Sequence, residues 1–345
     1  MRTSLVSIPA IKREYPVIIG QGAIAELPRL LKSLEPIDGV FIVFDVNVRE
    51  HAERVRTVLG EGSLVSVSPG EASKSLKEVQ RILRKLLDDG ASRQSVLINV
   101  GGGMITDLGG FVASVYMRGI RCIHVSTTFL GIVDAAIGGK TGVDLDETKN
   151  IIGHYHHPSA VIDDTDFLSA LSSHHLCEGF VEVIKIAAMR DAAFFSFLEE
   201  HVEEILRKDA ATLEQCICRA VELKASVVEG DERDQEERMF LNFGHTIGHA
   251  LEAASSFGIS HGEAVSIGMV AEMRLTRSSE ADRVCALLQK IEMPTEIPQK
   301  YGIETLLPLM LHDKKNTDAK IRIAVPRVLG KGELLHLDPV TLKPR

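Results

Sequence analysis

Several features that assign proteins to particular classes are missing from this sequence. No apolar run is long enough to cross a membrane, and the first residues, M-R-T-S-L-V-S-I-P, contain no apolar signal core. We therefore expect a cytoplasmic protein with no membrane partner. The chain also lacks a Pro-rich linker, an internal repeat and a low-complexity tract. With 345 residues, of which 45% are hydrophobic, it is long enough to form two globular domains.

An excess of positive charge and a cysteine framework are missing too. The net charge of 39 − 48 = −9 argues against a broad nucleic-acid-binding surface, so an anionic ligand would need a local pocket of lysines and arginines. The five cysteines are an odd number with no C-x-x-C spacing, and they predict reduced, mostly buried thiols.

The first half of the chain alternates strand-like and helical segments. Gly39–Phe44 and Ser95–Val100 are continuous apolar runs, which is the pattern of buried parallel strands. The second run leads into Gly101-Gly102-Gly103 and a helix, so backbone N–H groups at the helix start could cradle a phosphate. The spacing is not G-x-G-x-x-G, and a tight turn alone is the alternative. The alternation predicts an α/β nucleotide-binding domain over residues 1–166.

Three charged residues are also consistent with nucleotide or phosphate binding in this domain. Asp45 follows an apolar strand, where a carboxylate can accept hydrogen bonds from a ribose. Lys140 lies in the glycine-rich stretch V-D-A-A-I-G-G-K-T-G, and Lys149 in E-T-K-N-I-I-G. Two lysines in such loops indicate a pocket for a phosphorylated ligand about as strongly as a solvated surface.

From about residue 167 helical periodicity replaces the strands, which predicts an α-helical C-terminal domain over residues 167–345 with one final strand at Lys320–Val325. Glu182 and Lys185 lie one turn apart on an otherwise apolar helix, so they must pair with each other or bind a ligand.

The stretch R-M-F-L-N-F-G-H-T-I-G-H-A places His245 and His249 one helical turn apart, and His261 follows in S-H-G-E-A. Gly244 and Gly248 leave room for a ligand or another backbone. Three imidazoles so close together favour a metal site over histidines buried in a core.

Six motifs occur in one order: G-G-G-M-I-T-D, V-D-A-A-I-G-G-K-T-G, G-F-V-E-V-I-K, L-N-F-G-H-T-I-G-H-A, H-G-E-A-V and D-K-K-N. Together they resemble the 3-dehydroquinate synthase family of sugar phosphate cyclases over nearly the whole chain. The resemblance implies a dehydroquinate synthase-like fold, with an α/β Rossmann-like NAD-binding domain, an all-α C-terminal domain and an active site in the cleft between them.

The same resemblance implies a reaction. The enzyme would be a carbon–oxygen lyase of the shikimate pathway, which leads to aromatic amino acids. It would convert 3-deoxy-D-arabino-heptulosonate 7-phosphate to 3-dehydroquinate and phosphate. The steps would be transient oxidation by NAD, elimination of phosphate, reduction by the NADH formed, and an intramolecular aldol closure, so that NAD is regenerated in each turnover.

The resemblance also assigns residues to the site. One divalent metal, Zn²⁺ or Co²⁺, would be bound by Glu182, His245 and His261, a set that replaces the His245–His249 pair suggested by spacing. The NAD contacts would be Asp45, Asn47, Glu71, Lys74, Gly102, Gly103, Asp107, Thr127, Thr128, Lys140 and Lys149. The substrate-binding residues would be Arg118, Lys140, Asn150, Lys185, Lys224, Arg238, Asn242, His249, Lys314 and Lys315. Catalytic roles would fall to His249, Lys140, Lys185, Asn150 and Asp134. Arg118 would be contributed by the neighbouring subunit, which implies a homodimer.

The sequence departs from the family pattern in two places. Thr106 replaces a glycine before Asp107, and Ala170-Leu171-Ser172 stands where the family usually has Thr-Leu-Pro. Both departures concern the details of NAD binding.

Three other functions remain as alternatives. Another sugar phosphate cyclase is disfavoured because Lys224, Arg238, Asn242 and His249 together indicate a carboxylated substrate. A metal-dependent polyol dehydrogenase is disfavoured because a neutral polyol needs no lysine cluster. A non-catalytic NAD-binding protein is disfavoured by the intact candidate metal ligands.

Overall fold

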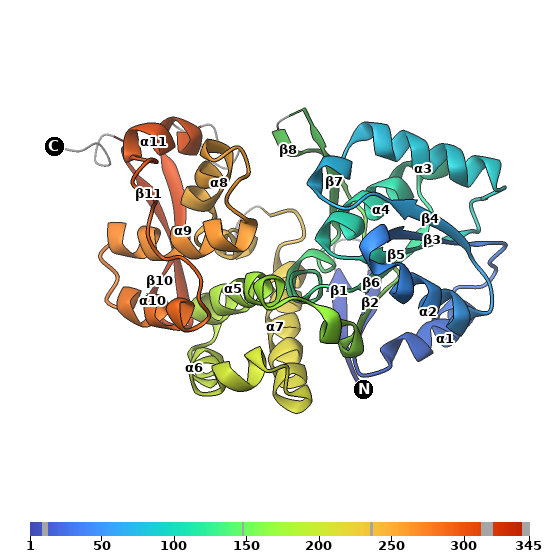
Figure 1. Cartoon of the computed structure of the whole chain (residues 1–345), viewed down its shortest axis with the longest axis horizontal. Coiled ribbons are helices and arrows are strands. Elements are labelled where there is room, and N and C mark those ends of the chain that lie inside the picture. Colours follow the sequence, from blue (N-terminus) through green and yellow to red (C-terminus); the bar gives the residue numbers. More distant parts are fainter. Residues whose placement is uncertain (9–12, 147, 235–236, 312–319, 340–345) are drawn as a thin grey trace. The chain divides into compact units, whose positions relative to one another are not determined.

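The computed structural model describes residues 1–8, 13–146, 148–234, 237–311 and 320–339 (Figure 1). Contacts between residues divide these into two compact units. The first comprises Met1–Leu176 and Lys224–Glu232, and the second comprises Cys177–Leu223 and the described residues from Arg233 onward. Compared with the ranges 1–166 and 167–345 expected from the sequence, residues 167–176 and Lys224–Glu232 fall in the first unit.

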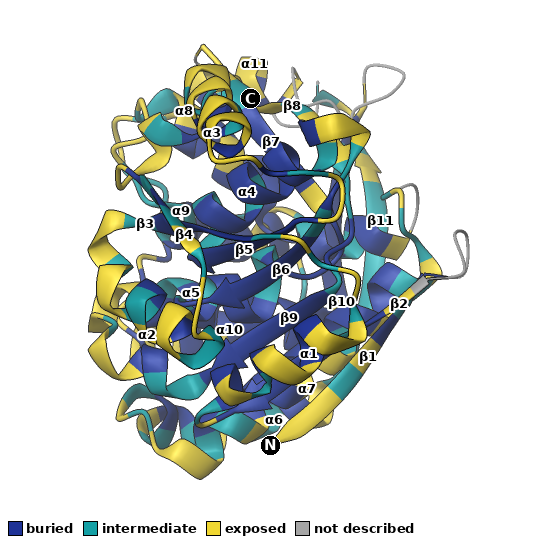
Figure 2. Ribbon diagram, turned by 90° about the vertical axis from the view of Figure 1, so that its right-hand side faces the viewer, coloured by how far each residue is buried: buried dark blue, intermediate teal, exposed yellow. Residues whose placement is uncertain are grey.

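A seven-stranded sheet in the order β1-β2-β9-β6-β5-β3-β4 forms the centre of the first unit. Its strands are β1 (Arg2–Ile8), β2 (Arg13–Gly20), β3 (Val40–Asp45), β4 (Ser63–Val67), β5 (Val96–Gly101), β6 (Arg121–Ser126) and β9 (Ala160–Asp164). All neighbouring pairs are parallel except β1 and β2. Strands β5, β6 and β9 are buried over nearly their whole length (Figure 2), as their apolar sequences predict.

Helices cover both faces of this sheet. On one face, α1 (Leu27–Ser33) and α2 (Arg49–Leu59) pack against the strands through residues such as Leu27 and Val55. On the other, α3 (Leu76–Asp88) and α4 (Gly103–Val115) pack through Ile82 and Leu108. Short helical turns complete the unit: η2 (Ala23–Glu26), η3 (Val46–Val48), η4 (Glu71–Ser73), η5 (Tyr116–Arg118), η6 (Gly131–Ala135) and η7 (Thr165–Ala170). The α/β fold predicted for the first half is confirmed.

A two-stranded hairpin in this unit was not predicted. Strands β7 (Lys140–Leu145) and β8 (Thr148–Tyr155) form it where the sequence suggested a glycine-rich loop. Its glycines serve the close pairing of the strands, because a Cβ on Gly142 would lie 2.8 Å from the carbonyl oxygen of Ile152, and one on Gly153 would lie 2.4 Å from that of Thr141.

The second unit is mainly helical. Its elements are most of α5 (Ser173–Arg190), α6 (Ala192–Leu206), much of α7 (Ala210–Gly230), η8 (Glu237–Asn242), α8 (His245–Ala254), α9 (His261–Leu275), α10 (Ala281–Lys290), α11 (Ile303–Leu311) and the hairpin β10 (Ile321–Val328) and β11 (Lys331–Leu337). The strand expected at Lys320–Val325 is confirmed as β10. Helix α8 starts at His245, because Gly244 before it adopts a left-handed conformation with φ 79°.

All five cysteines are free and buried, as predicted. Among the described residues, no helix combines the length and the apolar character that a membrane span needs.

Asp163 on β9 places a carboxyl group in the interior of the first unit, where its exposed fraction is 0%. Burial raises its pKa well above the usual range, and the hydroxyl of Ser126 offsets only part of this effect. An acid whose pKa is higher in the folded than in the unfolded chain lowers stability as the pH rises. The loss begins near pH 4, where the unfolded carboxyl ionises, and continues up to the folded pKa.

We therefore expect Asp163→Asn to raise the stability of the protein relative to the wild type more at pH 7 than at pH 4, since the amide never ionises. Thermal unfolding measured between pH 4 and pH 8 gives the comparison. Asp164→Asn is the control. The Asp164 carboxylate accepts hydrogen bonds from the backbone of Gly22 at 3.0 Å and Ile24 at 3.2 Å, so this change should destabilise. A lower melting temperature for Asp163→Asn at pH 7 would contradict the argument.

Candidate active site

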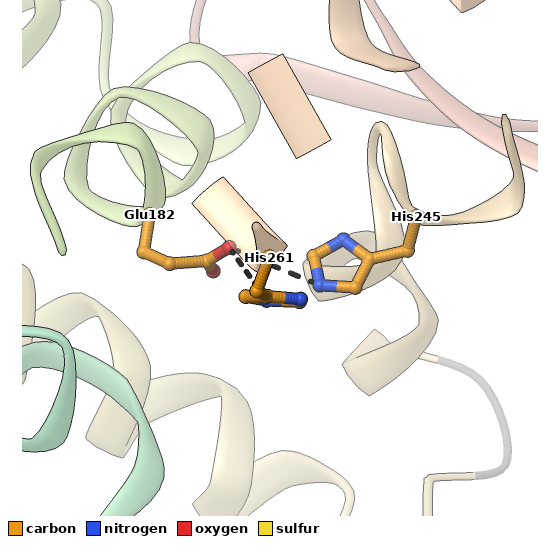
Figure 3. A group of neighbouring side chains, drawn as sticks. All are labelled: Glu182, His245 and His261. Atoms are coloured by element: carbon orange, nitrogen blue, oxygen red, sulfur yellow. Dashed lines mark ion pairs between the residues drawn. The ribbon is translucent and has the colours of Figure 1, made fainter. Parts of the chain in front are cut away.

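Helices α5, α8 and α9 bring Glu182, His245 and His261 together (Figure 3). One ligand atom from each lies within 4.8 Å of the others, and Glu182 and His245 are 3% and 9% exposed. Two imidazole nitrogens and one carboxylate oxygen are a donor set of catalytic zinc sites, and they leave a coordination position open. The residues therefore fit a divalent ion of the kind that the sequence predicts.

Both histidines turn the same ring nitrogen toward the carboxylate. The Nε2 atoms of His245 and His261 lie 3.8 and 3.7 Å from Oε1 of Glu182. Nδ1 of His245 lies 3.1 Å from the carbonyl oxygen of Phe243, to which only a protonated nitrogen can donate. This hydrogen bond leaves the lone pair of His245 on Nε2, which is the atom that faces Glu182.

The site attracts positive charge. Lys185 forms an ion pair with Oε2 of Glu182, and both side chains are buried on α5, so the pairing allowed by the sequence is present. Burial lowers the pKa of His261, but hydrogen bonding and charge attraction from Glu182 and Glu252 outweigh burial and raise the pKa to about 10. A pocket that holds a proton this firmly is suited to hold a metal cation in its place.

Glycines allow α8 and α9 to approach closely. A Cβ on Gly268 would lie 1.9 Å from the carbonyl oxygen of Gly244, and one on Gly244 would lie 2.7 Å from that of Val265. A Cβ on Gly248 would lie 3.1 Å from the carbonyl oxygen of Ala264. The room that the sequence shows around the two histidines is therefore filled by the backbone of α9.

The start of α9 is fixed equally closely. A Cβ on Gly262 would lie 2.7 Å from the Cα of Glu178 on α5, so only glycine fits there. Ser260 and Glu263 form a capping box around the first turn. Together these features place His261 beside α5. The S-x-x-E spacing of the capping box is a signal that sequence reasoning could have used.

Glu272 is a site residue that sequence reasoning missed. Its carboxylate is fully buried and accepts hydrogen bonds from the backbone N–H groups of Gly244 at 2.7 Å and Ile247 at 3.1 Å. These N–H groups lie at the start of α8 and have no acceptor within the helix, so Glu272 stabilises the turn that carries His245. Its distance along the chain from α8 gives no local pattern that would have found it.

The other predicted residues of the second unit lie on the same elements. The ring of His249 lies 5.1 Å from that of His245 and 6.4 Å from that of His261, measured between centroids. Arg238 and Asn242 belong to η8, where Arg238 is 3% exposed. Lys314 and Lys315 lie outside the described residues.

In the first unit, the predicted NAD contacts follow the carboxyl ends of four parallel strands, where nucleotides bind in such sheets. Asp45 is the last residue of β3 and Asn47 follows it, Glu71 and Lys74 follow β4, Gly102, Gly103 and Asp107 follow β5, and Thr127 and Thr128 follow β6.

Two of these loops are in direct contact. The backbone N–H of Thr127 donates to the carbonyl oxygen of Gly101 at 2.9 Å, and a Cβ on Gly102 would lie 2.9 Å from the side chain of Thr128. Gly102 is the N-cap of α4, and no side chain among the described residues caps this helix. Its first N–H groups therefore suit a phosphate, while the close packing also explains the glycines as a turn.

Lys74 is a buried cation in this cluster. Its Nζ lies 2.7 Å from Oδ2 of Asp107 and 3.6 Å from Oε1 of Glu71. Burial lowers the pKa of Lys74, but the charges of Asp107 and Glu71 outweigh it and raise the pKa above its usual range.

Thr106 faces inward, where its hydroxyl donates to the carbonyl oxygen of Gly103 at 3.0 Å, so this departure from the family pattern is a packing residue.

Other predicted residues of this unit lie on its hairpin, on η6 and on the part of α7 that belongs to it. Lys224 is buried and pairs with both the carboxylate and the main-chain oxygen of Asp134. Lys140 begins β7 and is exposed, whereas Lys149 and Asn150 lie on β8. Asn150 adopts φ 52°, and its N–H donates to Asp144 at 2.7 Å.

Arg118 lies in a strained and exposed turn. Met117 and Arg118 have φ values of 49° and 70°, which cost non-glycine residues about 1 kcal/mol or more each. Backbone strain of this kind is often found at functional positions.

Solved structures with this fold define the class of protein. A 2-deoxy-scyllo-inosose synthase in complex with carbaglucose-6-phosphate, NAD⁺ and Co²⁺ matches 99% of this chain and 98% of its own, with a TM-score of 0.88 and 24% identity. A 2-epi-5-epi-valiolone synthase from Streptomyces hygroscopicus with NAD⁺ and Zn²⁺ bound matches 95% and 94%, with a TM-score of 0.86 and 26% identity. The chain therefore has the fold of the sugar phosphate cyclases.

Sequence comparison identifies the family within this class. Residues 64–178 match the family described as 3-dehydroquinate synthase N-terminal, and residues 179–316 match 3-dehydroquinate synthase C-terminal. A 3-dehydroquinate synthase from Symbiobacterium thermophilum is 38% identical over 91% of this chain and 92% of its own. The chain belongs to the 3-dehydroquinate synthase family, and the resemblance seen in its motifs is confirmed.

Proposed function

We propose that this chain is a 3-dehydroquinate synthase, which converts 3-deoxy-D-arabino-heptulosonate 7-phosphate to 3-dehydroquinate and phosphate. The observation that carries the proposal is the convergence of Glu182, His245 and His261 in a chain that is 38% identical to a relative of that name. The reduced cysteines support a cytoplasmic location for the enzyme.

The cofactors of the proposal are NAD and one divalent metal, as in the two cyclases solved with NAD⁺ and Co²⁺ or Zn²⁺. Bound NAD would accept and return a hydride at C5 of the substrate, and the metal would polarise the C5 oxygen. Glu182, His245 and His261 would hold the metal. The loops after β3, β4, β5 and β6 would bind NAD, with the N-terminus of α4 facing its phosphates.

The remaining residues of the proposal bind and orient an anionic substrate. A carboxylate and a phosphate need cations, and an acidic chain must supply them locally. Lys140, Lys185, Lys224 and Arg238 would do so. His249, whose ring makes an angle of 88° with that of His245, would move a proton during the reaction, and Asp134 would hold Lys224 in place.

The test is an assay of phosphate release and product identity. The metal-loaded chain with NAD should release phosphate from the heptulosonate phosphate and form a carbocycle. An analogue that lacks the carboxylate should react far more slowly, by about a hundredfold or more, because buried cations would lose their partner. Equal rates for the two compounds would indicate another sugar phosphate cyclase, and no phosphate release from either would contradict the proposal.

We further propose that the enzyme is a homodimer in which Arg118 completes the site of the other subunit. The strained, exposed turn at Met117 and Arg118 supports this role, since it holds a cation away from its own fold. Symmetric dimers are the commonest oligomers, and across a two-fold interface each subunit contributes the same residue to the site of the other.

Subunit mixing tests this arrangement. Arg118→Ala and His245→Ala should each be nearly inactive alone. After they are unfolded and refolded together, about half of the dimers pair the two variants, and each mixed dimer has one intact site. About a quarter of wild-type activity should therefore return. If Arg118 acts in its own chain, every site lacks either Arg118 or His245. The mixture will then show no more activity than the separate variants.

A further inference from the structure

His261 faces a carboxylate on each side of its ring. Its Nε2 lies 3.7 Å from Oε1 of Glu182, and its Nδ1 lies 3.6 Å from Oε1 of Glu252. Glu252 is 4% exposed on α8, although it is absent from every assignment made above from the motifs. A buried carboxylate beside the far nitrogen of a candidate ligand is placed to accept the proton of that nitrogen, because a buried charge is stabilised by a hydrogen-bond donor.

Helix α8 carries both this carboxylate and one of the candidate metal ligands, His245. His245, His249 and Glu252 are spaced i, i+4 and i+7, so they lie along one face of the helix. His261, at the start of α9, meets this face, and it can form a metal-binding group either with Glu182 and His245 or with His249 and Glu252. The two nitrogens of one imidazole thus connect two clusters.

The hydrogen bond of the His245 ring indicates which of the two clusters would bind the metal ion. Its Nδ1–H is directed to the carbonyl oxygen of Phe243, so its lone pair faces Glu182. For His261 to present a lone pair to the same place, its proton must be on Nδ1, where Glu252 can accept it. Histidines that bind metals commonly donate the other ring N–H to a carboxylate or a carbonyl, which fixes the ring and makes the ligand more basic.

We infer that Glu252 is a positioning residue for the metal. Its carboxylate holds the Nδ1 proton of His261 and orients the ring so that Nε2 faces Glu182 and His245. The two histidines are then supported alike, one by a backbone carbonyl and the other by a buried carboxylate. This inference rests on the proposed metal ligands and adds to them a residue that binds neither metal nor substrate.

The experiment measures Zn²⁺ affinity of the full-length chain in competition with a chelating dye. The wild type should bind one ion per chain. Glu252→Gln keeps the size of the side chain but not its charge, and it should weaken binding by about 10- to 100-fold. Glu263→Gln is the matched control. It removes the same charge two residues from His261, and glutamine preserves the capping box, so Zn²⁺ affinity should not change.

A second readout separates positioning from general destabilisation. The melting temperature of metal-free Glu252→Gln should stay near that of the wild type, while the visible absorption bands of its Co²⁺ form should shift with the altered coordination. If Glu252→Gln does not fold, Glu252→Asp withdraws the carboxylate from Nδ1 and gives the same comparison.

Two results would overturn the inference. One is an unchanged Zn²⁺ affinity in Glu252→Gln. The other is two ions bound to the wild type and one to Glu252→Gln, which would make Glu252 a ligand of a second metal. A separate variant tests the underlying site: if Glu182→Gln binds Zn²⁺ as tightly as the wild type, the proposed ligand set fails whatever Glu252 does.

Discussion

His245→Ala is expected to lose the bound metal and to turn over substrate about a thousandfold more slowly. The change would remove one of the three proposed ligands, and the charge stabilisation that a metal gives is worth several kcal/mol, roughly 4 kcal/mol for a thousandfold effect. Metal content per chain and kcat, both measured after removal of loosely bound ions, give the comparison.

His249→Ala is the matched control for this change. It makes the same substitution one turn further along α8, where the exposed imidazole lies beside the proposed ligands. This variant should keep its metal and still lose turnover, because it would remove the group that we propose moves a proton. If instead His249→Ala loses the metal and His245→Ala keeps it, the ion belongs to the group formed by His249, Glu252 and His261.

Arg238→Ala should lower kcat/KM by roughly a hundredfold or more with little change in the melting temperature. Removing one member of a buried charge pair costs about 3 kcal/mol, and we expect the buried Arg238 to bind a substrate anion. Steady-state kinetics and thermal unfolding of the metal-free protein provide the two readouts.

Arg190→Ala controls for the structural contribution of an arginine near η8. Nη2 of Arg190 lies 3.7 Å from Oε2 of Glu237, and its guanidinium lies 5.9 Å from the centroid of the Phe240 ring. Arg190 is not among the residues assigned to substrate binding. It should affect stability more than kinetics. A large loss of stability with normal kinetics in Arg238→Ala would instead identify Arg238 as a structural residue.

The sequence predicts the sheet well because each buried parallel strand is a continuous apolar run. Gly39–Phe44 and Ser95–Val100 correspond to β3 and β5 to within a residue or two at each end. The hairpin was missed because its strands, K-T-G-V-D-L for β7 and T-K-N-I-I-G-H-Y for β8, have neither a long apolar run nor sustained alternation. Its strands form through tertiary contacts around glycine, which local propensity does not show.

The candidate site shows where spacing is informative and where it fails. Spacing alone pairs His245 with His249, since both lie on one face of α8. The structure also brings in Glu182 from α5 and His261 from α9, and only the family resemblance had joined these three residues beforehand. Glu252 and Glu272 were not singled out because their roles depend on where α8 and α9 touch, which close glycine contacts determine.

The fate of NAD during turnover tests the central claim most directly. With NAD at a small fraction of the heptulosonate phosphate concentration, we expect phosphate release to exceed the NAD present many times over, while NADH absorbance stays constant in the steady state. Hydride that leaves and returns within each turnover requires this result. One NADH accumulated for each substrate consumed, with turnover stopping when NAD is exhausted, would contradict the account and indicate a dehydrogenase.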